Sequence, residues 1–341
     1  MTNLYGLELP QLALALAGLE LRGYQPRQIY HWIYARRAFD PLDWTDQPRA
    51  LRARLAREFT VEPGRIADRL PAADGTVKYR IALAGGDEVE SVEMQQSGRA
   101  TLCVSSQVGC ALGCDFCLTG KMGLRRHLTP GEIVGQVARI QEDRALAAGS
   151  FNVVFMGMGE PLHNYDAVLA ALRLLADPAG CGLSLRRITV STAGLAPAIE
   201  RLAAEPRRPR LAVSLNATSD AVRDRIMPIN RRYPLARLRQ ACELWAARTG
   251  EPFTFEYVLL AGVNDSDAEL GRLPQLIRGL PAKVNLIPFN AVPQWLAYQP
   301  PDRARVLAVR DRLLGRGVRT SIRWSRGAQA RAACGQLALL G

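Results

Sequence analysis

The chain has 341 residues, 48% of them hydrophobic, and its 44 Lys and Arg against 32 Asp and Glu give a formal net charge of +12. This length allows one large domain and a small accessory one. The basic excess favours a polyanionic partner, nucleic acid first, unless the source proteome is basic as a whole. No run of about 18 apolar residues predicts a membrane span, and no signal-peptide pattern is present. We therefore expect a cytoplasmic protein without membrane contact, whose seven cysteines are available for metal binding or catalysis.

The first part of the chain has the pattern of short helices. Pro10, Pro26 and Pro48 suit first helical turns, and apolar side chains follow at helical spacing. We interpret residues 1–70 as a helical accessory domain that contacts nucleic acid, with an ordinary solvated face as the alternative. The third helix would carry four arginines: Arg49, Arg52, Arg54 and Arg57.

A meander of β-strands is predicted next, over residues 71–98. Residues 76–83 and 88–94 alternate between apolar and polar, and glycine-containing turns follow each run. Glu90 shares a face of the second strand with Val92, an unusual place for a carboxylate, although a surface position is the alternative. A third strand, residues 99–105, carries Cys103 and leads into a cysteine-rich loop.

Short β-rich runs alternate with helical stretches, such as 130–147 and 166–176, from Cys110 onward. This alternation predicts a parallel sheet with right-handed crossovers. We predict an α/β fold over residues 99–341 with about six β/α units in an incomplete barrel, whose functional groups lie at the C-terminal ends of the strands. The β-rich runs are 152–155, 187–190, 211–214, 254–259, 284–287 and 320–322.

Cys110, Cys114 and Cys117 lie close together on one predicted loop, with aromatic Phe116 before the last of them. Three thiolates on such a loop can hold three corners of an iron–sulfur cubane. Because no fourth cysteine is nearby, one iron would stay open to bind the amino and carboxylate groups of S-adenosylmethionine. Structural zinc with His127 as a fourth ligand is the alternative.

The C-x3-C-x-Φ-C spacing resembles the signature of the radical S-adenosylmethionine (radical SAM) superfamily, and the flanks resemble the RlmN/Cfr family of RNA methyltransferases. The resemblance implies a partial (β/α)6 radical SAM barrel with a helical accessory domain and a β extension. It also implies a [4Fe–4S] cluster with one open iron and two S-adenosylmethionine molecules per turnover. The similar segments are 99–110, 155–161, 227–230, 262–265 and 332–337.

The same resemblance implies the cofactor contacts. Gly159 would allow close backbone approach, and Glu160 would bind the cofactor's ammonium group. Many relatives have His where this chain has Asn216, so that contact would use the backbone or a different side-chain atom here. The remaining contacts would be Ser191, Ser214, Leu215, Asn216 and Asn290, for which ordinary turn chemistry is the alternative.

Cys334 is implied by the resemblance to carry the methyl group as an S-methylcysteine intermediate; otherwise it would be a buried small hydrophobe. An adenosyl radical would activate that methyl group for attack on a non-nucleophilic adenine carbon. Cys103 would resolve the adduct through a transient disulfide with Cys334, and Glu90 would accept the proton. Relatives carry acidic residues before this cysteine, whereas residues 326–333 are basic and neutral here.

The function implied is methylation of adenosine C2 in 23S rRNA, with tRNA as a second candidate substrate, in rRNA and tRNA processing. C8 methylation, which gives ribosomal antibiotic resistance, uses the same residues and stays open, as does a non-catalytic, zinc-bearing RNA-binding protein. We expect a monomer that receives electrons from a reductase or flavodoxin-type donor. Cys181 and Cys242 match no motif and are interpreted as structural.

Overall fold

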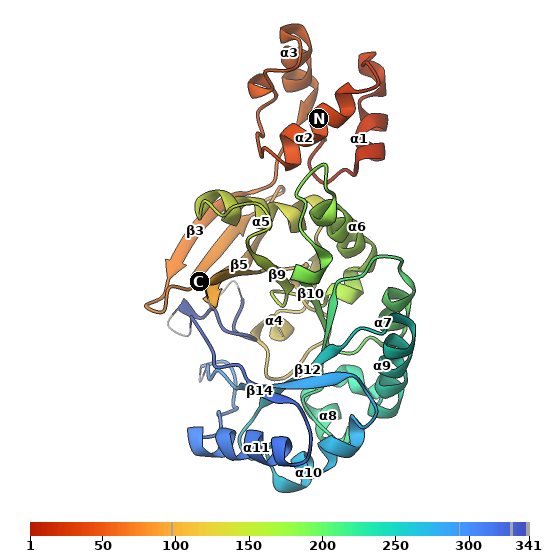
Figure 1. Ribbon diagram of the computed structural model, residues 1–341. Helices are drawn as coiled ribbons and strands as arrows, with labels where there is room; N and C mark the ends of the chain where they lie inside the picture. The colour runs from red at the N-terminus through yellow and green to blue at the C-terminus, as the bar shows by residue number, and fades with distance from the viewer. Residues whose placement is uncertain (97, 293, 328–329, 339–341) are drawn as a thin grey trace.

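The computed structural model describes residues 1–96, 98–292, 294–327 and 330–338. A ten-stranded sheet runs through the molecule in the order β14-β13-β12-β11-β10-β9-β6-β5-β4-β3 (Figure 1). Neighbours from β6 to β14 pair in parallel, and β3 to β6 pair antiparallel. The strands are β3 (Arg65–Pro71), β4 (Val77–Ala82), β5 (Glu88–Gln96), β6 (Arg99–Cys103), β9 (Asn152–Phe155), β10 (Ile188–Thr192), β11 (Arg210–Ser214), β12 (Phe253–Leu259), β13 (Ala282–Pro288) and β14 (Thr320–Ile322).

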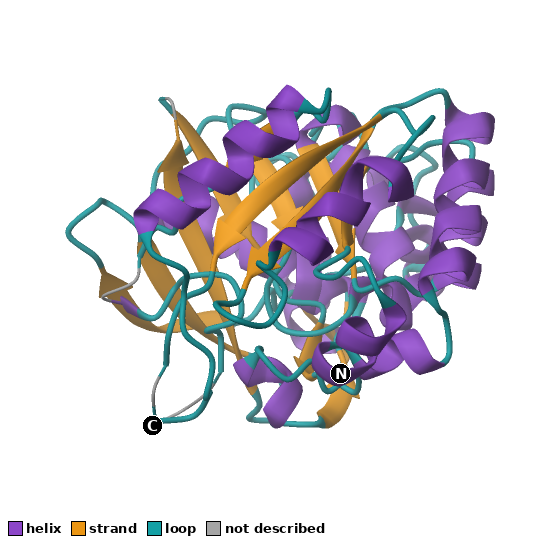
Figure 2. Ribbon diagram, turned by 90° about the horizontal axis from the view of Figure 1, so that it is seen from below, coloured by secondary structure: helices purple, strands orange, loops and turns teal. Residues whose placement is uncertain are grey.

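The parallel part confirms the predicted α/β fold with an incomplete barrel. The sheet stays open, with β14 and β3 as its two edges among the described residues. Helices connect the parallel strands and cover the sheet (Figure 2). Within the described ranges, none is long and apolar enough to cross a membrane. The connecting helices are α5 (Pro130–Asp143), α6 (Tyr165–Ala176), α7 (Ala196–Ala204), α8 (Asp220–Ile226), α9 (Leu235–Thr249), α10 (Asp267–Leu276) and α11 (Arg303–Gly315).

The start of α5 is fixed by its own sequence. The Thr129 hydroxyl accepts a hydrogen bond from the Glu132 N–H, and the Glu132 carboxylate accepts one from the Thr129 N–H. This capping box satisfies two backbone donors, and Pro130 suits the first turn. The helix that leads from β8 toward β9 therefore begins at a defined point.

The N-terminal helices, α1 (Leu9–Ala15), α2 (Gln25–Tyr34) and α3 (Arg49–Glu58), lie at one end of the molecule (Figure 1). A short parallel pair of strands, β1 (Thr2–Asn3) and β2 (Phe59–Thr60), joins the two ends of this helical segment. Strand β3 begins at Arg65, before the expected boundary at residue 70. Its side chains are mostly exposed, so no alternation of apolar residues indicates this edge strand in the sequence.

Candidate active site

The cysteine loop is tied at its base by two short antiparallel strands, β7 (Gln107–Gly109) and β8 (Leu124–His127). The Cys110 N–H donates to the Gly123 carbonyl over 2.8 Å. Gly109 has a φ of +78°, and a Cβ there would lie 1.8 Å from the Gly123 oxygen. Only glycine fits this close approach, so the residue before the first cysteine is part of the loop's construction.

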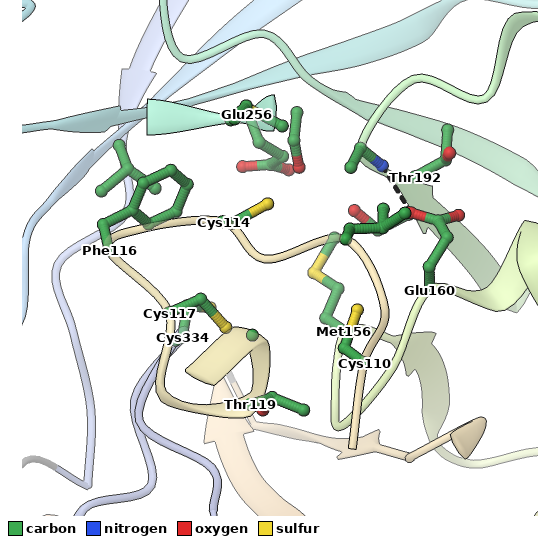
Figure 3. Close-up of a pocket in the computed structure, with 18 of the residues that line it drawn as sticks. Cys110, Cys114, Phe116, Cys117, Thr119, Met156, Glu160, Thr192, Glu256 and Cys334 are labelled. Atoms are coloured by element: carbon green, nitrogen blue, oxygen red, sulfur yellow. Dashed lines mark hydrogen bonds between the residues drawn. The ribbon is translucent and has the colours of Figure 1, made fainter. Parts of the chain in front are cut away.

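The three thiols of the loop line one cavity of about 950 Å³, part of it open to solvent (Figure 3). The Cys117 N–H donates to the Cys114 carbonyl over 3.1 Å, which turns the chain tightly before the short helix α4 (Leu118–Lys121). Burial raises the pKa of Cys110 to about 12, and it also raises the pKa of Cys114 and Cys117. A bound metal would be needed to hold these groups as thiolates at neutral pH.

The chemistry of these donors suits an iron–sulfur cluster. Among the described residues, no three His, Cys, Asp or Glu side chains converge closely enough to hold a single metal ion. The thiols instead lie along the wall of a shared cavity. An iron–sulfur cubane takes one thiolate per iron, so three thiols in the wall of one cavity could hold three of its irons.

Glu160 is held in place at the cavity wall. Its N–H donates to the Gln107 side-chain oxygen over 2.8 Å, and its carboxylate accepts hydrogen bonds from the N–H groups of Leu162 and Ala193 at 3.0 and 2.7 Å. Burial raises the pKa of Glu160 to about 7. The preceding Gly159 has a φ of +97°, and a Cβ there would lie 2.5 Å from Gln107. A buried, oriented carboxylate beside a glycine can bind an ammonium group.

The predicted cofactor contacts are largely brought together. Asn216 has a φ of +56° and a buried side chain whose oxygen accepts the Val258 N–H over 2.8 Å. That amide is therefore already engaged within the protein. Leu215 and Asn290 are outside the lining that the described residues form. The predicted contacts in the lining are Gly159, Glu160, Ser191, Ser214 and Asn216.

A row of polar side chains crosses four parallel strands, and the sequence predicts only one of its members, Ser214. Ser214, Glu256, Asn285 and Ser321 are in register on β11 to β14. Asn285 donates to Glu256 Oε1 over 3.1 Å and accepts from the Ser321 hydroxyl over 2.5 Å. Glu256 Oε2 is buried at the cavity wall and has no hydrogen-bond partner among the described residues (Figure 3). A carboxylate inside a mainly apolar, β-rich run was the signal in the sequence.

Cys334 belongs to a C-terminal segment that docks on the cysteine loop. The Leu118 N–H donates to the Gly335 carbonyl over 2.8 Å, and the Thr119 hydroxyl donates to the Leu337 carbonyl over 2.5 Å. Cys334 lines the cavity of the three loop cysteines, and it also lines a second cavity. It is thus a wall residue of both.

Cys103, at the end of β6, lines the second cavity together with Cys334. Burial, and after it the nearby Cys334 thiol, raises the pKa of Cys103 to about 12. All seven cysteines, which lie within the described ranges, are free thiols. The fold therefore brings the two predicted redox partners to one cavity in the reduced state.

Glu90 is buried, so the alternative of a surface carboxylate is wrong. Its Oε1 lies 2.8 Å from Lys78 Nζ, and its Oε2 accepts the Ala338 N–H over 2.9 Å. Burial raises the pKa of Glu90, although Lys78 acts in the opposite direction. Breaking a buried ion pair costs about 3–5 kcal/mol. Glu90 is thus a firm anchor for the segment that carries Cys334.

Comparison with known proteins extends this picture. Residues 104–273 match the model of the radical SAM superfamily, and residues 2–61 match that of the ribosomal RNA large subunit methyltransferase N-terminal domain. The crystal structure of a radical SAM methyltransferase from Sphaerobacter thermophilus superposes with a TM-score of 0.94 and 44% identity, over 99% of both chains. Fold and site therefore define a radical SAM enzyme, a class that implies a [4Fe–4S] cluster and S-adenosylmethionine as cofactors.

Curated relatives narrow the class. A dual-specificity RNA methyltransferase RlmN from Anaeromyxobacter dehalogenans (strain 2CP-C) is 49% identical, over 98% of this chain and 91% of the relative. A probable dual-specificity RNA methyltransferase RlmN from Synechococcus elongatus is 45% identical, over 98% of this chain and 93% of the relative. The chain belongs to the RlmN family of RNA methyltransferases. The zinc-bearing, non-catalytic alternative is not favoured.

Proposed function

We propose that this protein methylates C2 of an adenosine in 23S rRNA, with tRNA as a second substrate, and that Cys334 carries the methyl group. The observation that supports this most strongly is that Cys334 lines both the cavity of the three loop cysteines and the cavity that contains Cys103. A carrier must receive a group in one place and deliver it in another. A thiol in the wall between two cavities suits both steps.

In the first cavity, Cys110, Cys114 and Cys117 would hold the cluster and leave one iron open, and Glu160 would bind the cofactor's ammonium group. When bound, the cluster and two S-adenosylmethionine molecules per turnover supply a methyl group and a hydrogen-abstracting radical. Ser191, Ser214, Leu215, Asn216 and Asn290 would orient the rest of the cofactor.

In the second cavity, the side chains of the protein would complete the transfer. The Cys334 sulfur, which also lines the first cavity, would already have taken the methyl group from the sulfonium there. Removal of one hydrogen atom from that methyl group would leave a methylene that bonds to the adenine carbon, and the adduct would then return one electron to the cluster and lose the ring proton. Glu90, which lies outside the lining of both cavities and holds the segment that carries Cys334, would accept the ring proton. Cys103 would then attack the Cys334 sulfur, which forms a disulfide between them and releases the methylated base. An external reductant would restore both thiols.

Each of the three segments of the chain would have its own role. Residues 1–70 would form an accessory domain that contacts RNA, residues 71–98 a β extension, and residues 99–341 the catalytic domain with its methyl-carrier segment. Phosphate contacts are also expected from Arg125 and Arg126, the basic positions beside the cluster loop. Both are already engaged, because Arg125 and Arg126 pair with Asp87 at 2.9 and 2.6 Å and Arg126 also pairs with Glu132 at 2.8 Å, so they contribute less in this proposal. The protein would act as a cytoplasmic monomer with a reductase or flavodoxin-type electron donor.

Isomer analysis of the product tests this function. The protein, loaded with iron and sulfide under anaerobic conditions, is incubated with unmodified 23S rRNA, S-adenosylmethionine and a reductant. The RNA is then digested to nucleosides and compared by mass spectrometry with 2-methyl- and 8-methyladenosine standards. We expect only the 2-methyl isomer; the 8-methyl isomer alone, or no methyladenosine, would overturn the proposal.

A further inference from the structure

The second cavity has a wall of unusual composition. It encloses about 850 Å³ of empty space, part of it open to solvent. No Asp or Glu contributes to the wall that the described residues form. The lining consists of two thiols, apolar side chains, a short polar stretch and two guanidinium groups: Met94, Cys103, Met156, Ile287, Ile322, Arg323, Trp324, Ser325, Arg326, Ala332, Ala333, Cys334 and Leu337. Such a wall suits a ligand that is flat, apolar on its faces and negatively charged at one end.

The two arginines of the wall differ in depth. Arg323 is partly buried, and its Nη1 contacts the Met156 sulfur at 3.3 Å. Arg326 is exposed, and its Nη1 donates to the Gln95 carbonyl over 2.5 Å. This bond fixes Arg326 near the opening while leaving other donors of its guanidinium available. Positive charge is therefore held at the outer end of the cavity.

Trp324 also lies at the outer end. Its side chain is 41% exposed, whereas Cys103, in the same wall, is 6% exposed. The guanidinium carbon of Arg303, from the start of α11, lies 4.8 Å from the Trp324 ring centroid. This cation–π contact orients the indole and adds a second cation beside it. A large, oriented and half-exposed aromatic ring next to arginines is the arrangement on which proteins stack nucleobases.

We propose that Trp324 is a stacking platform for a nucleobase of the RNA strand that enters the second cavity, with Arg303 and Arg326 beside the adjoining phosphates. This inference rests on the proposed function, because it takes RNA as the substrate. The stacked base would hold the strand at the opening while the target adenine reaches Cys334. Stacking tolerates every base, so Trp324 contributes affinity and no sequence preference.

The proposal is tested by comparing RNA binding of the parent protein with that of two variants, Trp324→Ala and Trp324→Phe. Leu314→Ala, which removes a 47% exposed apolar side chain from the far end of α11, is the matched control. Filter binding gives the Kd for an unmodified 23S rRNA transcript, and the same samples give the yield of methyladenosine. We expect Trp324→Ala to raise the Kd about 10- to 100-fold, the loss typical of one stacked base. Trp324→Phe and Leu314→Ala should stay within about threefold of the parent.

A second measurement distinguishes a stacking role of the indole from a structural one. Transfer of a methyl group from S-adenosylmethionine to Cys334 without RNA should proceed normally in Trp324→Ala, because the cofactor cavity does not include Trp324. An unchanged Kd in Trp324→Ala, or an equal loss in Trp324→Phe, would overturn the platform. If the parent protein binds RNA through Trp324 but forms no methyladenosine, the proposed methylation is contradicted, whereas the stacking role of Trp324 is supported.

Discussion

The two sulfur centres of the molecule are built in opposite ways. The cluster loop holds Cys110, Cys114 and Cys117 on one short segment, tied at its base by β7 and β8. Cys103 and Cys334 come from the first parallel strand and from the C-terminal segment, and they meet only when the sheet is assembled. The comparison teaches that the cofactor chemistry is encoded locally, whereas the proposed reaction depends on the tertiary fold.

The largest expected effect separates the two centres directly. Cys114→Ala should lose iron, cleavage of S-adenosylmethionine and RNA methylation together, because one cluster ligand is gone. Cys334→Ala should lose RNA methylation alone and keep iron and cofactor cleavage. Iron analysis, 5′-deoxyadenosine yield and methyladenosine yield measure the three properties. Cys181→Ala, outside both cavities, is the control and should keep all three; RNA methylation by Cys334→Ala would contradict the carrier role.

The second prediction concerns only the tertiary pair. Cys103→Ala should trap a covalent adduct between the RNA and Cys334, because no thiol remains to attack the Cys334 sulfur. Denaturing gels of labelled RNA detect the adduct, and a peptide map locates it. Normal turnover without an adduct would mean that Cys103 does not resolve the intermediate.

The third prediction concerns the cofactor cavity. Glu160→Gln should weaken binding of S-adenosylmethionine about 10- to 100-fold, because a charge-assisted hydrogen bond contributes about 1.5–3 kcal/mol. Burial raises the pKa of Glu160 to about 7, so protonation should weaken cofactor binding to the parent as the pH falls below 7. Binding titrations from pH 6 to 8, about one unit each side of that pKa, check this. The same decline with pH in Glu160→Gln would assign the titration to another group.

The smallest expected effect concerns the accessory domain. Arg49 is exposed at the start of α3 and makes no ion pair among the described residues, whereas Arg54 pairs with Glu58 at 3.0 Å. Arg49→Gln should lower the salt dependence of RNA binding by about one unit of slope, as expected for one phosphate contact. Arg54→Gln is the matched control and should change the slope less. If the salt dependence of RNA binding had the same slope in the parent and in both variants, α3 would not contact the RNA.

The sequence predicts those features that neighbouring residues encode. The parallel strands β9 to β14 are recognisable because buried strands form short β-rich runs between helices. The cluster loop is recognisable from cysteine spacing alone. Edge strand β3 is not, because its exposed side chains do not alternate in hydrophobicity.

Features that depend on strand register or on contacts between distant segments cannot be predicted from the sequence and are seen only in the structure. Glu256 becomes a site residue only because its two neighbouring strands place Ser214 and Asn285 beside it in register. Trp324 is identified as a candidate RNA contact only because the structure places it in the wall of the second cavity and beside Arg303. Cys103 and Cys334 line one cavity because the C-terminal segment leaves the edge strand β14 and docks on the cysteine loop, a long-range contact that local spacing does not encode.

The passage of the methyl group through Cys334 is the central claim, and an isotope chase tests it most directly. The reconstituted protein is incubated with S-adenosylmethionine labelled in its methyl group, freed of excess cofactor, and then given RNA with unlabelled cofactor. The account predicts label on the Cys334 peptide before RNA is added and in 2-methyladenosine afterwards. Label in the RNA that never passes through the Cys334 peptide would contradict it.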